Sequence, residues 1–173
     1  MTQVSQVKVQ QYLSVIGKSE SKQEQGVALE KLMISLLRKI PGITVTKRSE
    51  KNKFQDDEVD IVCWNDRHKN GLYFLPNILT IGAFHWLEPV SSTQIKSLLN
   101  IIKKRGLSFG VLVAINGLTE EQEERAGARD LILSALSDER QIVILRGSDF
   151  EKLSSSNQLV RLFKEKLCEL AVA

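Results

Sequence analysis

The sequence FGVLVAI at residues 109–115 is an unbroken apolar run. Such a run predicts a strand covered on both faces, as the central strands of parallel sheets are. A helical pattern precedes it over residues 91–105, with Ser91 as the expected cap, and a second one follows over residues 119–136. A strand between two helices indicates crossover connections, and therefore an α/β fold.

The rest of the chain extends this pattern in both directions. A stripe of leucine and isoleucine predicts a helix from Gly26 to Ile40, which Pro41 ends. Asn70-Gly71 is typical of a tight turn with positive φ angles, so we expect a hairpin there. Further strands are expected at residues 43–46, 58–64, 78–81 and 142–145, and a last helix at 159–170. The predicted fold is three-layer α/β, a central mixed sheet flanked by helices.

The N-terminal segment has a weaker pattern. Residues 1–17 are loosely helical, and the polar run KSESKQEQ at residues 18–25 is typical of a linker. We therefore expect a peripheral N-terminal helix with its linker at residues 1–25, and one folded domain at residues 26–173.

Composition excludes several classes of protein. The chain has 173 residues, with 24 Lys+Arg against 21 Asp+Glu and 42% hydrophobic residues, which suits one domain with its own core. Cys63 and Cys168 are the only cysteines, which excludes a zinc ribbon or a disulfide scaffold and indicates a reducing, cytoplasmic setting. No stretch reaches about 18 consecutive apolar residues, so we expect no contact with a membrane.

Several short phrases occur in an informative order. They are GVALE at residues 26–30, EVDIV at 58–62, PVSS at 89–92 and NGLT at 116–119. In this order and spacing they resemble the Mrr-type branch of the restriction-endonuclease-like superfamily, over residues 26–153. The resemblance implies a three-layer nuclease fold, double-stranded DNA as a partner, and Mg²⁺ as the cofactor of active members.

The resemblance also implies where catalytic groups would stand. Active members have an acid on the second strand, matched here by Asp60, and often a helix glutamate, matched by Glu30. Their third strand carries Glu-x-Lys or Gln-x-Lys, so that carboxylates hold a metal ion and lysine orients the attacking water.

The third strand of this chain departs from that pattern. The triplet falls on Ile81-Gly82-Ala83, and shifting it by one residue either way gives Thr80 with Gly82 or Gly82 with Phe84. None of these side chains is a ligand for a hard cation. We therefore expect a degenerate nuclease with vestigial positions at Glu30, Asp60, Ile81 and Ala83. No catalytic residue, cofactor or metal is expected, and Asp60 would be the ligand if a metal were bound.

Other residues offer replacement chemistry. His85 with Glu88 would supply a ligand or a general base, and Lys96 a lysine displaced onto the next helix. The structural alternative for His85 is a hydrogen-bonded histidine at a strand end, and Lys96 would restore nothing without a second carboxylate. Asp60 would instead pair with a base or face solvent. Glu30 would interact favourably with the helix dipole near the start of its helix.

Basic residues suggest contacts with a phosphate backbone. The candidates are Lys51 and Lys53 in the polar loop and Lys103, Lys104 and Arg105 at a helix end. The alternative is a solvated surface balanced by the acids at 56–58 and 120–124.

Three functional hypotheses follow. The first is a non-catalytic nuclease-fold protein that binds double-stranded DNA, or serves as a subunit of a bacterial DNA-processing or defence system. The second is an active Mg²⁺-dependent DNA endonuclease whose catalytic residues are relocated. The third is a structural domain that assembles with a protein subunit or as a homodimer, without nucleic acid.

Overall fold

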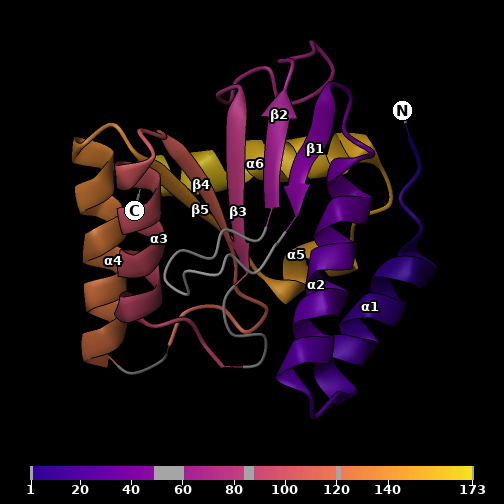
Figure 1. The fold of residues 1–173 in the computed structure, drawn as a ribbon, viewed down its shortest axis with the longest axis horizontal. Coiled ribbons are helices and arrows are strands. Elements are labelled where there is room, and N and C mark those ends of the chain that lie inside the picture. The colour runs from indigo at the N-terminus through magenta and orange to yellow at the C-terminus, as the bar shows by residue number, and fades with distance from the viewer. Residues whose placement is uncertain (1, 49–60, 84–87, 120–121, 173) are drawn as a thin grey trace.

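The computed structural model of the chain describes residues 2–48, 61–83, 88–119 and 122–172. Within these ranges it has five strands and six helices in one α/β domain (Figure 1). The strands are β1 Ile43–Arg48, β2 Ile61–Asn65, β3 Ile78–Ala83, β4 Phe109–Val113 and β5 Gln141–Leu145. The helices are α1 Gln6–Lys18, α2 Lys22–Leu37, α3 Ser92–Lys104, α4 Gln122–Ser137, α5 Gly147–Glu151 and α6 Ser156–Ala171.

The sheet is mixed, as the sequence predicts. Its strand order is β1-β2-β3-β4-β5, with β2 antiparallel to both neighbours and the pairs β3–β4 and β4–β5 parallel. The parallel pairs require crossovers, which α3 and α4 provide. Every residue of β4 is buried, in agreement with its continuous apolar run.

Helices cover both faces of the sheet. One face packs on α1, α2, α5 and α6, and the other packs on α3 and α4. Figure 1 shows α3 and α4 side by side next to β4 and β5, with α6 passing behind the strands. Strand alternation sorts side chains between the two layers, because successive residues point to opposite faces.

The N-terminal helix differs from its prediction. Val9 and Ile16 of α1 are buried in the same core as Leu29 and Leu32 of α2, so α1 is not peripheral. The expected linker is also shorter. Residues 22–25 form the first turn of α2, where Gln25 is buried and its amide bonds to the carbonyl oxygen of Ser19. A polar run can thus begin a helix when its side chains bond to the preceding turn.

The β2–β3 connection is not the tight turn that Asn70-Gly71 suggests. The only positive φ angle among its described residues belongs to Arg67, at 56°. Gly71 is needed for a different reason: a Cβ atom there would lie 2.1 Å from the carbonyl oxygen of Pro41. The glycine permits a close approach between two backbone segments, which is the other common use of this residue.

Candidate functional site

Ile81, the first position of the expected catalytic triplet, lies in the hydrophobic core. Its register partner across the antiparallel pair is Ile61, and its parallel neighbour is Val111. All three side chains are 0% exposed and belong to the layer that packs on α2 and α6. A group at position 81 is therefore surrounded by apolar side chains, which neither water nor a phosphate reaches.

The opposite face of β3 presents no ionisable group either. Thr80 is 1% exposed, and its hydroxyl donates a hydrogen bond to the carbonyl oxygen of Phe109 at 3.2 Å. Gly82 is buried and has no side chain. Thr80 thus satisfies its polar atom within the sheet, where an unpaired hydroxyl would be costly. The backbone of Ala83 ends the strand.

Glu30 does not stand where the sequence interpretation places it. Because α2 begins at Lys22, Glu30 is in the third turn of the helix, well beyond the first turn where an acid favours the dipole. The acid of that first turn is Glu24. Glu30 is half-buried and makes no hydrogen bond or ion pair with another described residue.

The replacement candidates do not gather into a site within the described ranges. Asp60 and His85 lie outside the described residues. Glu88 is exposed and forms a 4.0 Å ion pair with Lys22 at the start of α2. Exposed pairs of this kind contribute little to stability. Lys96 is exposed on α3.

The described residues include no cluster of donors for a metal ion. Mg²⁺ in proteins is held by oxygen ligands, carboxylates above all. Among residues 2–48, 61–83, 88–119 and 122–172, no three His, Cys, Asp or Glu side chains are close enough together to hold an ion. The side chains at positions 80–82 supply no carboxylate, so the described donors do not fit this cofactor.

The basic residues lie away from the end of β3. Lys103, Lys104 and Arg105 are exposed at the C-terminal end of α3, while Lys51 and Lys53 are outside the described residues. Since β3 and β4 are parallel, α3 returns to the end of the sheet where both strands begin. Ala83 is at the other end of β3, about 17 Å from the first residue of that strand, because six residues span five steps of ~3.3 Å. The basic cluster and Ala83 therefore lie toward opposite ends of the sheet.

The structure also reveals a cavity that sequence reasoning missed. It has a volume of about 550 Å³ and lies between the β2–β3 connection and the first turns of α6. Lys164 on α6 is far in sequence from Lys69 and Tyr73 in the β2–β3 connection, so no local motif indicates the site. The one local signal is Tyr73-Phe74, an aromatic pair in a turn-rich connection.

A buried asparagine fixes one wall of this cavity. Asn65, at the end of β2, is 0% exposed, and its side-chain nitrogen lies 2.8, 3.3 and 3.1 Å from the carbonyl oxygens of Leu72, Leu75 and Pro76. Its side-chain oxygen accepts a bond from the backbone N–H of Arg67 at 3.0 Å. One side chain therefore satisfies backbone groups all along the connection, which holds that wall in place.

Two comparisons bear on the identity of the chain. The family model of the Mrr-type restriction endonuclease catalytic domain matches residues 21–153. This segment runs from the N-cap of α2 to just beyond α5, and so includes all five strands. No curated protein matches the chain. As for membranes, no helix within the described part of the chain is both long enough and apolar enough to span one.

Proposed function

Because the chain belongs to the Mrr-type restriction endonuclease family, we propose that it is a nuclease-fold protein that binds double-stranded DNA without hydrolysing it. The observation behind this proposal is the placement of Ile81 in the core, opposite Ile61. The family is typically Mg²⁺-dependent. Here the third strand offers apolar or small side chains where metal ligands and a lysine are needed.

Binding without cleavage needs only positive charge and hydrogen-bond donors at a suitable spacing. The exposed Lys103, Lys104 and Arg105 supply both at one end of the sheet. We therefore assign these residues to backbone contacts that position the protein on DNA.

A DNA-binding protein of this family would serve in a bacterial DNA-processing or defence system, where a partner subunit supplies cleavage. The two cysteines are free thiols, which suits a reducing cytoplasm.

The experiment is a salt titration of duplex binding, followed by fluorescence anisotropy. We expect the affinity of the full chain to fall steeply with salt, because neutralised phosphates release counterions. The triple variant Lys103→Ala/Lys104→Ala/Arg105→Ala should reduce the slope of log K against log[salt] by up to about 3, since each phosphate contact contributes ~0.9.

A matched triple variant separates specific contacts from total charge. Lys8, Lys18 and Lys31 are exposed on α1 and α2, so replacing all three with alanine removes the same charge elsewhere. Equal loss of affinity in both triple variants would contradict the assignment to α3. Absence of any salt-dependent duplex binding would favour the structural domain or homodimer instead.

A further inference from the structure

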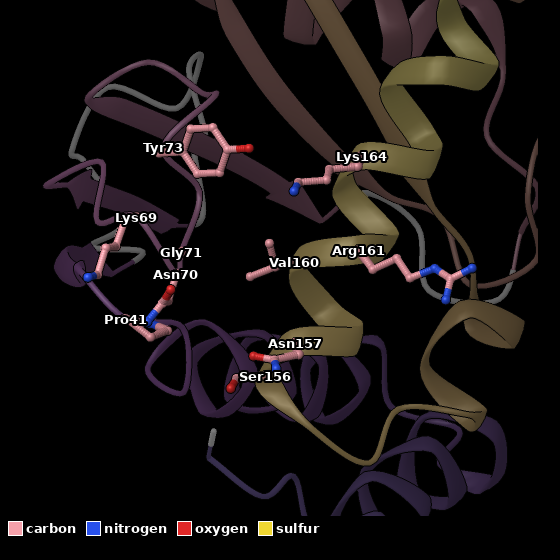
Figure 2. Close-up of a pocket in the computed structure, with 10 residues that line it drawn as sticks. All are labelled: Pro41, Lys69, Asn70, Gly71, Tyr73, Ser156, Asn157, Val160, Arg161 and Lys164. Carbon is pink, nitrogen blue, oxygen red and sulfur yellow. The ribbon is translucent and has the colours of Figure 1, made fainter.

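The cavity beside α6 has the size of a small-molecule site. Its volume of about 550 Å³ falls within the range of about 300–1,000 Å³ that is usual for such sites, and it exceeds what a single inorganic phosphate would fill. Val160 forms an apolar floor, and Gly71 packs against Pro41 along one side (Figure 2). Since the Asn65 side chain bonds to backbone groups of the connection, this wall exists before a ligand arrives.

The cavity is electropositive. Lys69, Arg161 and Lys164 line it, and no carboxylate is present among its described lining residues. Arg161 is paired with Glu165 at 2.8 Å, and Figure 2 shows its side chain running away from the loop. Lys69 and Lys164 form no ion pair with any carboxylate that the structure describes. An anion can therefore contact Lys164 without breaking an existing salt bridge, whereas Figure 2 shows the Lys69 side chain pointing away from α6.

Lys164 is held in place by aromatic rings. Its ammonium group lies 5.2 Å from the ring centroid of Tyr73 and 5.3 Å from that of Phe74, which are cation–π distances. The two rings meet edge to face, with centroids 5.3 Å apart and planes at 88°. Figure 2 shows Lys164 reaching from α6 toward Tyr73. The lysine is thus positioned at the cavity by contacts that are weaker than an ion pair.

Tyr73 offers a flat surface at the same place. It is 45% exposed, although its neighbour in the connection, Leu72, is fully buried. An anion that draws the Lys164 ammonium away would free the face of the Tyr73 ring for a planar group. Nucleobases stack on such rings, and a phosphate on the same ligand would pair with the Lys164 ammonium.

We propose that this cavity binds a phosphorylated nucleoside, with the phosphate on Lys164 and the base against Tyr73. The same chemistry is present in a free nucleotide and in the 5′-phosphorylated end of a DNA strand. The proposal does not rest on duplex binding by α3, because the two sites share no residue.

The experiment is calorimetric titration of the full chain with deoxyadenosine 5′-monophosphate. We expect saturable binding, and at least about tenfold weaker binding of inorganic phosphate and of deoxyadenosine, each of which lacks half of the recognised groups. Lys164→Gln should weaken the nucleotide about tenfold, and Lys164→Arg should restore most of the loss. Tyr73→Leu should weaken it about fivefold or more.

Two controls make the result specific. Lys8→Gln removes an exposed lysine on α1, and Lys103→Ala/Lys104→Ala/Arg105→Ala removes the α3 cluster; both should leave nucleotide affinity unchanged. A flat titration at millimolar nucleotide would overturn the proposal. Inorganic phosphate binding as tightly as the nucleotide, or an equal loss in Lys164→Gln and Lys8→Gln, would also overturn it.

Oligonucleotides identify the source of the ligand. A short single strand is compared with and without a 5′-phosphate. Tighter binding of the phosphorylated strand than of the mononucleotide indicates a DNA end, whereas the reverse order indicates a free nucleotide. Both outcomes support the site, provided that Lys164→Gln weakens the binding.

Discussion

Ile61 and Ile81 lie directly opposite each other on β2 and β3, and neither side chain is exposed. Asp60 immediately precedes Ile61 in sequence, and Ile81 begins the triplet that would carry the second acid and the lysine. The pair belongs to an apolar row that continues through Val111 to Val143 across four strands. The Ile81 side chain is therefore part of the core packing between the sheet and its helices.

Substitution of Ile81 tests this packing. Ile81→Val should lower the free energy of unfolding by about 0.5–1.5 kcal/mol, because it removes one buried methylene group. Ile81→Glu should lower it by about 3 kcal/mol or more, because a carboxyl group in this layer has no partner. Urea denaturation measures both values.

The double variant Ile81→Glu/Ala83→Lys extends the test to metal binding. We expect it to be destabilised and to bind no Mn²⁺ in a calorimetric titration. A double variant that keeps the stability of the parent chain and binds Mn²⁺ would show that position 81 belongs to a solvated site.

Asn65 gives a second prediction. Asn65→Ala should lower the free energy of unfolding by about 2–4 kcal/mol, because it leaves several buried backbone groups without their partner. Amide hydrogen exchange in residues 66–77 should increase in the same variant. Asn70→Ala, on the exposed part of the connection, is the control and should change stability by less than about 0.5 kcal/mol. Equal effects of the two variants would refute the role assigned to Asn65.

Substitutions at two glycines distinguish the effect of close packing on stability from the effect of backbone conformation. Gly71→Ala should lower the free energy of unfolding by about 3 kcal/mol or more, because the new Cβ atom would collide with the carbonyl group of Pro41. Gly106→Ala meets open space, but its φ of 64° is left-handed, so the expected cost is about 1–2 kcal/mol. Thermal unfolding ranks the two variants, and the opposite order would contradict the packing of Gly71 against Pro41.

Cys63 gives a prediction about pH. Burial raises the pKa of its thiol from 9.0 to about 12. Between these values the unfolded chain loses the thiol proton and the folded chain retains it. The thiol therefore makes its full contribution to the free energy of unfolding below pH 9. That contribution falls by about 1.4 kcal/mol per pH unit as the pH rises toward 12.

The measurement is urea denaturation of the parent chain and variants between pH 8 and about 10.5, a window set by that raised pKa. Cys63→Ala should lower stability at pH 8 and show a shallower alkaline slope than the parent. Cys168→Ala changes an exposed thiol and should leave the slope unchanged. If Cys63→Ala has the same slope as the parent chain, the thiol does not titrate with the predicted shift.

Much of the fold could be predicted because it depends on local patterns. Three elements can be predicted from the residues of their own segments. They are the apolar strand β4, the leucine-rich helix α2 and the start of α3 at its cap Ser91. Features set by tertiary contacts could not be read in this way. Burial of α1 depends on a partner helix, and the need for Gly71 depends on Pro41, thirty residues away.

The features of the candidate site fall into the same two groups, those visible in the sequence and those set by tertiary structure. The absence of ionic side chains from Ile78–Ala83 is visible in the sequence, whereas the burial of Ile81 and the separation of the end of β3 from Lys103 follow only from the register and topology. The cavity beside α6 joins three distant segments through side chains that are individually unremarkable. No periodicity or motif brings Tyr73 and Lys164 together.

Supercoiled plasmid incubated with the full chain in Mg²⁺ or Mn²⁺ tests the central claim most directly, with Asp60→Ala as the matched variant. We predict that the parent chain binds the plasmid and leaves it intact, and that Asp60→Ala gives the same result. Nicked or linear plasmid that forms with the parent chain and not with Asp60→Ala would contradict the account.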